Sequence, residues 1–219
     1  LFHRTRDASW LEGDWPETVH GIRVGDGHDA ARILVVSDVF YAEVQRLGVP
    51  LITHEGTGMV GASSTVGIDR YDSFMFTHTV SHTMEQMLAS LSVILGGVCE
   101  RFPKMKVGFF EGGASWLPYW LWRMDEHWEK RPDELQWLKH SPTEYFRRQC
   151  WISCDADEGT IPQAVQGLGS EKIIFGSDYP HWDSVFPGAP NFIAQHPEIS
   201  EEAKRNILCE NSRKFFQID

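Results

Sequence analysis

The sequence predicts an α/β fold in which the strands of one parallel sheet alternate with helices. Short apolar runs that end in a polar residue recur along the chain, and segments with helical spacing separate them. Two parallel neighbours in a sheet need a crossover connection, which is right-handed and usually helical. The alternation therefore predicts a layer of helices against the sheet, with the C-terminal ends of all strands on one side.

Length and composition set the scale of this fold. A chain of 219 residues is long enough for one substantial core and too short for two comfortable domains, so we expect a single domain over residues 1–219. The net charge of −11 argues against binding of nucleic acid or of an anionic membrane surface. No apolar run approaches the roughly 20 residues of a membrane span, and no signal peptide is visible, so we expect a cytoplasmic protein.

The elements follow in a clear order after a weakly patterned beginning. One short strand is predicted over residues 19–24, and an amphipathic helix over 38–47 ends at Gly48. A strand over 51–54 ends in His54 and leads into a glycine-rich loop. The remaining predicted elements are helices over 84–101, 116–130, 161–168 and 200–216, the last capped by Ser200, and strands over 106–110, 151–154 and 173–176.

The four cysteines form no CxxC pair. Cys150 and Cys154 fall on one face of a predicted strand or its exit. We interpret them as core thiols rather than as a disulfide or a zinc site.

The most informative segment is residues 173–181, because an acid follows directly on a short apolar strand. Gly-Ser precedes Asp178, and the Tyr-Pro after it prevents the strand from continuing, since proline has no N–H and restricts the residue before it. A carboxylate at such a tip suits a metal ligand or a general base; the alternative is an Asx turn. His54 and Glu111 end two other predicted strands, and Asp155 is a fourth candidate, so these groups are predicted to converge on one site.

Other candidates carry an alternative interpretation. Glu111 is a candidate catalytic residue, or it caps the following helix. His78 and His82 are spaced i, i+4 and could ligate a metal on a helix, although surface histidines at a loop-to-helix entry are the simpler interpretation. His181 is predicted near the mouth in a substrate-binding role, and Trp116 either lines a substrate pocket or packs a helix against the sheet. Neither GxGxxG nor GxxxxGK[ST] occurs, which argues against nucleotide binding.

Four segments together resemble a known family. Residues 50–56, 101–107, 110–113 and 175–181 occur in the order seen in the amidohydrolase-related (amidohydrolase-2) family, and residues 206–213 resemble its last helix. This family includes aminocarboxymuconate-semialdehyde decarboxylase, resorcylate-type decarboxylases and metal-dependent hydrolases. The resemblance runs from about residue 19 to the end of the chain and is specific through order and spacing.

The resemblance implies a (β/α)8 TIM barrel with a divalent metal, usually zinc or manganese, at its C-terminal mouth. His54 matches a metal ligand after the fifth strand of the family. Asp178 matches a metal ligand after the eighth, which also handles the proton of the metal-bound water. Decarboxylases of the family carry a catalytic histidine after the sixth strand, where this chain has Glu111, and this difference favours hydrolysis.

The family also takes two ligands from a His-x-His or Glu-x-His motif after its first strand, and no His-x-His occurs here. The matched strands are the fourth to the eighth, so we expect an incomplete barrel whose open edges favour a homo-oligomer, such as a dimer. We expect the chain alone to bind metal weakly.

The function expected from these observations is that of a metal-dependent hydrolase. It would act through a metal-activated water on a small, carbonyl- or carboxylate-bearing, aromatic substrate, with zinc as the expected metal and manganese as the alternative. Two other functions stay open: a non-oxidative decarboxylase of the same family, and a non-catalytic or partner-dependent truncated barrel.

Overall fold

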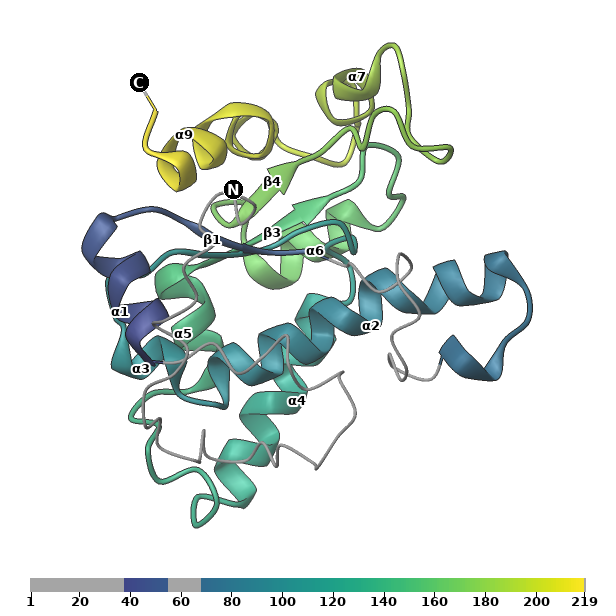
Figure 1. Cartoon of the computed structure of the whole chain (residues 1–219). Coiled ribbons are helices and arrows are strands. Elements are labelled where there is room, and N and C mark those ends of the chain that lie inside the picture. The colour runs from purple at the N-terminus through teal and green to yellow at the C-terminus, as the bar shows by residue number, and fades with distance from the viewer. Residues whose placement is uncertain (1–37, 55–67, 219) are drawn as a thin grey trace, which may run out of the picture.

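Four parallel strands form the centre of the protein, for which a computed structural model describes residues 38–54 and 68–218 (Figure 1). The strands are β1 (Leu51–Thr53), β2 (Val107–Phe109), β3 (Cys150–Cys154) and β4 (Ile173–Phe175), and their order in the sheet is their order in the chain. Each strand pairs in parallel with the next. Successive β/α units in this order are the building plan of a TIM-type barrel, and the described residues form a part of one.

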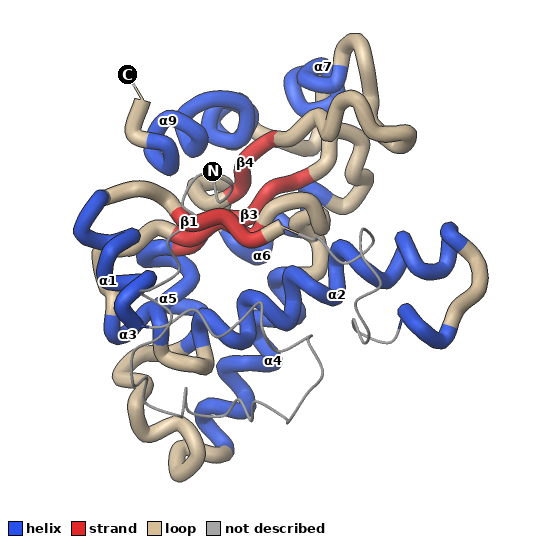
Figure 2. The backbone as a smooth tube through the Cα atoms, viewed as in Figure 1, coloured by secondary structure: helices blue, strands red, loops and turns tan. Residues whose placement is uncertain are grey.

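Helices cover both sides of this sheet (Figures 1 and 2). Helices α1 to α6 lie on one side, and α9 lies on the other side beside β4. The helices are α1 (Asp38–Leu47), α2 (Phe74–Ile94), α3 (Val98–Arg101), α4 (Leu117–Lys130), α5 (Pro142–Gln149), α6 (Ile161–Leu168), α7 (Ala189–Ala194), α8 (Glu201–Arg205) and α9 (Asn211–Phe216), with a 3-10 turn at Ile68–Arg70 and a π turn, η5, at Asn206–Glu210.

Most predicted elements are confirmed within a residue or two, and the exceptions have physical reasons. The helix expected over 84–101 begins ten residues earlier, and it breaks before Gly97, whose φ of 76° suits glycine. The early part of α2 was missed because its apolar side chains, including Phe74 and Phe76, are exposed and give no amphipathic signal. The strand expected over 19–24 and the glycine-rich loop lie outside the described residues.

Serine caps begin two helices, α8 and α5, of which only the first was predicted. Ser200 caps α8 as expected, with its hydroxyl accepting from the Ala203 N–H. The expected continuous helix is interrupted by the π turn η5. Helix α5 was not predicted, although Ser141 and Glu144 form a complete capping box at its start.

The strands separate two layers of core. Cys150, Ile152 and Cys154 point from β3 into the large core beneath α2 to α6. Trp151 points to the other side, where it packs with Phe215 of α9. This alternation fixes which strand residues can reach the inner side of the barrel and its mouth.

Three of the four cysteines behave as core thiols. Cys99, Cys150 and Cys154 are buried and free, and Cys209 is exposed and free, so no disulfide forms. Burial raises the pKa of the Cys154 thiol, which keeps it neutral. Among the described residues, no helix combines the length and the apolar character that crossing a membrane requires.

Candidate metal centre

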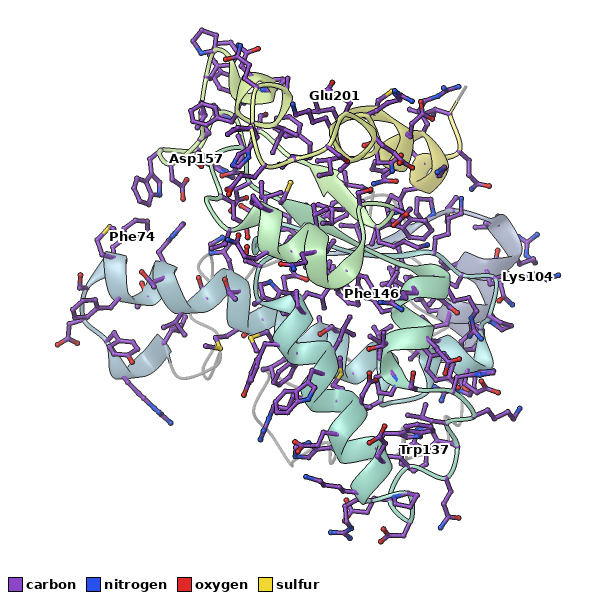
Figure 3. The ribbon with its side chains drawn as sticks, turned by 180° about the vertical axis from the view of Figure 1, so that it is seen from behind. Phe74, Lys104, Trp137, Phe146, Asp157 and Glu201 are labelled. Carbon is purple, nitrogen blue, oxygen red and sulfur yellow. The ribbon has the colours of Figure 1, made fainter. Side chains whose placement is uncertain are left out.

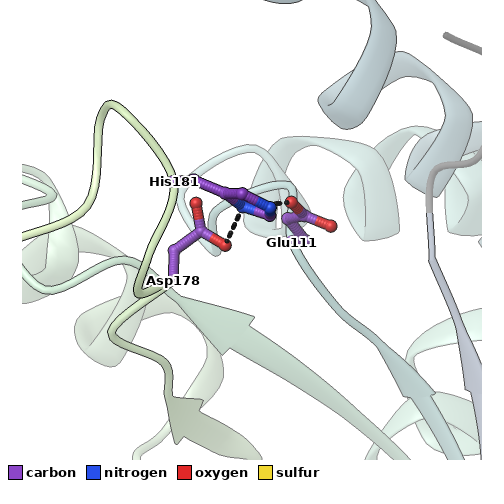
Figure 4. A group of neighbouring side chains, drawn as sticks. All are labelled: Glu111, Asp178 and His181. Carbon is purple, nitrogen blue, oxygen red and sulfur yellow. Dashed lines mark hydrogen bonds and ion pairs between the residues drawn. The ribbon is translucent and has the colours of Figure 1, made fainter.

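Side chains from the C-terminal ends of the strands meet at one site. Asp178 follows β4, and its Oδ1 lies 2.8 Å from Nδ1 of His181. Glu111 follows β2, and its Oε1 lies 3.5 Å from the same nitrogen (Figure 4). Ligand atoms of these three residues all lie within 4.8 Å of one another, which is a spacing that one metal ion can bridge.

Two further histidines approach the Glu111 carboxylate. His54 follows β1, and its Nε2 contacts Oε2 of Glu111. His82, on α2, places its Nε2 3.7 Å from Oε1 of the same residue. The expected convergence of His54, Glu111 and Asp178 on one side of the fold is therefore observed, with His82 and His181 added to it.

Both carboxylates of the site sit on unusual backbone. Glu111 has a φ of 59° and Asp178 a φ of 55°, in the left-handed region that non-glycine residues rarely adopt. Such conformations cost of order 1 kcal/mol or more and cluster at functional sites. The turns aim both side chains away from the strand direction and toward the mouth.

Neighbouring elements hold the turn at Glu111 in place. Its backbone N–H donates to Oγ of Ser153 on β3 at 2.9 Å. The next carbonyl, of Gly112, accepts from Oγ1 of Thr83 and from Nε1 of Trp116, at 3.1 and 3.0 Å. Trp116, predicted as a substrate contact, therefore lies behind the site, where its half-buried indole packs against the main core.

A second carboxylate braces the same turn, and sequence reasoning missed it. Glu158, in the loop after β3, accepts from the N–H groups of Ala114 and Ser115 at 3.0 and 2.8 Å, and Ser115 Oγ also donates to it. Because the donors belong to a distant loop, no local sequence pattern reveals this role. The cluster ties the loop after β2 to the loop after β3.

An open cavity of about 320 Å³ lies in front of these groups. It is lined from α2 by His78, His82 and Thr83, and from the loops after β2, β3 and β4 by Glu111, Gly112, Asp155, Ala156, Asp157, Gly176, Ser177, Asp178, Asp183 and Val185. His78, predicted to contact substrate, is thus in the wall of the cavity. The alternative interpretation, surface histidines at a loop-to-helix entry, placed the start of the helix too late, because α2 already begins at Phe74.

Aromatic rings stand at the edge of this cavity. The ring centroid of His78 lies 5.2 Å from that of Phe74 and 5.4 Å from that of Trp182, and both of those aromatic side chains are exposed. Figure 3 shows Phe74 at the far end of α2, on the same side of the molecule as Asp157. A planar, conjugated group entering the cavity would meet these rings.

The cavity wall is strongly acidic. Its described lining includes five carboxylates and no lysine or arginine. Partial desolvation raises the pKa of Asp155, which is exposed at the cavity, to about 6, and the nearby carboxylates, with Glu158 first and Asp178 next, add to the shift. The hydrogen bond to Asp178 raises the pKa of His181.

The donor set fits a divalent metal ion. Carboxylate oxygen and imidazole nitrogen are ligands that zinc and manganese both accept. Oε2 of Glu111 is buried and makes no hydrogen bond, apart from its ion-pair contact with His54, among the described residues. A buried anionic oxygen of this kind requires a positive partner.

Similarity to known proteins agrees with the fold. A sequence profile of the amidohydrolase family matches residues 15–218. The chain therefore belongs to the amidohydrolase family, as the order of its motifs indicated.

Two characterised relatives and one solved structure represent the neighbours. The chain is 30% identical to the 2-amino-3-carboxymuconate-6-semialdehyde decarboxylase of Dictyostelium discoideum, over 82% of this chain and 48% of that protein. It is 24% identical to the gamma-resorcylate decarboxylase of a Rhizobium species, over 82% and 54%. The manganese-bound dihydroxybenzoic acid decarboxylase from a Polaromonas species superposes with a TM-score of 0.62 at 20% identity, over 82% and 53%. The chain thus spans about half the length of the relatives it matches.

Proposed function

We propose that the protein is a metal-dependent carboxy-lyase that removes carbon dioxide from an aromatic or muconate-type acid. The observation that carries the proposal is the meeting of Glu111, Asp178 and His181 at the mouth of a barrel-type sheet. Family membership supports it, because the two relatives named above are decarboxylases of such acids. This proposal replaces hydrolysis, the function expected from the sequence, as the leading one.

Glu111, Asp178 and His181 are the residues that would hold the metal, with His54 beside Glu111. When bound, a divalent cation supplies Lewis-acid chemistry: it polarises the oxygens of the substrate and stabilises negative charge that develops on them. The donor set admits zinc or manganese, and the manganese in the Polaromonas neighbour makes manganese the first metal to test.

The side chains around the metal site have separate tasks. Asp178 accepts the Nδ1 hydrogen bond of His181 and thereby fixes the orientation of that ring. His82 brings a further imidazole toward Glu111, so the cavity contains histidine although Glu111 stands where family decarboxylases carry one. His78, Phe74 and Trp182 form an aromatic edge that suits a planar substrate.

The absence of lysine and arginine from the described cavity lining also limits the substrate. The carboxylate of the substrate finds no fixed cation among those side chains, so its binding is expected to depend on the metal. Binding of the acid without metal should accordingly be weak.

The proposal is tested by carbon dioxide release. The full chain is loaded with Mn²⁺ or Zn²⁺ and incubated with gamma-resorcylate (2,6-dihydroxybenzoate) and with 2-amino-3-carboxymuconate 6-semialdehyde. We expect metal-dependent release of carbon dioxide from at least one of them, abolished by a chelator and restored by metal. No release from either acid in the loaded protein would overturn the proposal.

Hydrolysis is the second candidate, because Glu111 offers a carboxylate base where family decarboxylases carry a histidine. Turnover of simple aromatic esters or amides by the metal-loaded protein, without carbon dioxide release from the two acids, would favour it. A Glu111→Gln variant, which keeps the shape but lacks the base, would then lose that turnover.

A further inference from the structure

Strand β3 contributes a carboxylate to the cavity that the metal centre does not use. Every second residue of β3 and its exit points to the same side of the sheet, and this set is Trp151, Ser153 and Asp155. Trp151 lies on the side that packs with Phe215 of α9. Ser153 shares this side, because its Oγ accepts from the Glu111 N–H. Asp155 continues this row directly into the cavity wall, between the strands that carry Glu111 and Asp178.

We infer that Asp155 is the acid that delivers a proton to the substrate carbon from which carbon dioxide leaves, an inference that rests on the carboxy-lyase proposed above. The bond between this carbon and the carboxylate breaks, carbon dioxide departs, and the electron pair stays on the carbon. The O–H bond of the Asp155 carboxylic acid breaks as the new C–H bond forms. Asp155 is left as a carboxylate and regains its proton from solvent, so that one acid and one proton give one product and one carbon dioxide.

The carboxylates of the metal centre are less suited to this task. Asp178 accepts a hydrogen bond from His181, and Glu111 faces three imidazoles, so the oxygens of both carboxylates are already engaged. The carboxyl group of Asp155 makes no hydrogen bond or ion pair among the described residues; only its backbone N–H is engaged, with Glu158 at 3.4 Å. It is also outside the three residues whose ligand atoms cluster. Asp155 is therefore free to carry a proton toward the cavity.

Its surroundings favour the protonated form. The pKa of Asp155 is raised to about 6, first because nearby protein atoms partly desolvate the carboxyl group, although the residue stays exposed at the cavity. The negative charges that face it add to this: Glu158 and Asp157 on its own loop, and Asp178 and Asp183 on the loop after β4. A general acid is most effective when its pKa lies near the working pH.

The experiment compares wild-type protein with Asp155→Asn, Asp155→Glu and Asp157→Asn, each loaded with Mn²⁺. Asp157→Asn is the matched control, because it removes the same charge from the same wall two residues away. Carbon dioxide release from 2,6-dihydroxybenzoate is measured between pH 5 and 8. Exchange of the resorcinol C2 hydrogen for deuterium in D₂O reports the proton transfer alone, because it needs no carboxylate to leave.

We expect Asp155→Asn to lose both release and exchange by about 10²-fold or more, while it keeps its metal and its thermal unfolding midpoint. Wild-type kcat/KM should fall as the pH rises through the pKa of the acid, and this limb should vanish in the residual activity of Asp155→Asn. Asp155→Glu should recover part of the exchange, and Asp157→Asn should lose far less than Asp155→Asn. In the metal-free protein, the Asp155 carboxyl signal, identified by its loss in Asp155→Asn, should titrate near pH 6 in ¹³C NMR.

The outcomes separate this inference from the function on which it rests. Active wild type with an equally active Asp155→Asn, or with an unchanged pH limb in that variant, would overturn the role of Asp155 and leave the carboxy-lyase intact. Loss of the metal from Asp155→Asn would overturn it as well, because Asp155 would then be a ligand. Absence of carbon dioxide release from wild type, with either of the two acids, would overturn the carboxy-lyase and the inference together.

Discussion

The N-terminal end of the parallel sheet carries lysines and the C-terminal end carries carboxylates, and the two ends differ in how these charges are partnered. At the N-terminal end, Lys106 donates to the carbonyl of Lys214 at 2.5 Å, and the Nζ of Lys172 lies 3.5 Å from the centre of the Trp151 ring. At the C-terminal end, five carboxylates and two histidines line one cavity.

The difference indicates what each end does. Lys106 and Lys172 each have a partner in the fold, a carbonyl of α9 and the ring of Trp151, although burial lowers the pKa of both lysines. The carboxylates at the other end crowd together, and two of them stand on left-handed backbone. At the N-terminal end, each of these charges has its own partner in the fold. At the C-terminal end, where we place the chemistry, charges of one sign gather at a conformational cost.

The largest expected effect comes from Asp178, at the C-terminal end of the sheet. Asp178→Asn should lower carbon dioxide release by about 10²- to 10⁴-fold, because the amide keeps the shape but loses the charge that binds metal. The unfolding midpoint should change little, since asparagine tolerates the φ of 55° and relieves repulsion among the carboxylates. Turnover and thermal unfolding of the same preparation check this. An unfolded variant would show that Asp178 is needed for stability, and a fully active one would show that its charge is not needed for turnover.

At the N-terminal end of the sheet we expect the reverse, a loss of stability with activity retained. The buried amide of Asn211 donates to the carbonyls of Ser170 and Ile173 at 2.6 and 2.7 Å, and so ties α9 to the start of β4. Asn211→Ala leaves these carbonyls without that donor and should lower the free energy of unfolding by about 2–4 kcal/mol, with turnover per folded molecule unchanged. Urea unfolding measures it, and the exposed Asn191→Ala is the control.

If Asn211→Ala instead removed activity from fully folded protein, the N-terminal end would have a direct role in the chemistry. A stability equal to that of Asn191→Ala would show that the two hydrogen bonds contribute nothing.

A smaller effect should come from Lys172 and depend on pH. Burial lowers its pKa from 10.5 to about 8 in the folded protein. Between these two values the unfolded chain binds more protons at this site, so the contribution of Lys172 to stability rises with pH from about 8 to 10.5 and is lowest below pH 8. The difference in unfolding free energy between wild type and Lys172→Met should therefore grow in favour of wild type over this range. A difference independent of pH would contradict the burial of this charge.

The strands and helices were easier to predict from the sequence than the side-chain contacts of the candidate site. The strands and helix α6 were predictable because their apolar runs and periodicity are local, and Asp178 was predictable because an acid directly after a buried strand points to a mouth. The roles of His82 and Glu158 were not, because they depend on contacts with residues far away in the chain. Trp116 was a reasonable pocket candidate by type, and only its packing behind Gly112 removes it.

We propose that the acidic mouth of the sheet is a metal centre. Titration of the metal-free chain with Mn²⁺, followed by electron paramagnetic resonance, tests it without any substrate, with Glu111→Gln and Asp178→Asn as variants and Asp157→Asn as control. We expect one saturable Mn²⁺ site per chain in wild type and in the control, weakened about tenfold or more in each of the two variants. Absence of a saturable site in wild type, or equal affinity in all four proteins, would contradict it.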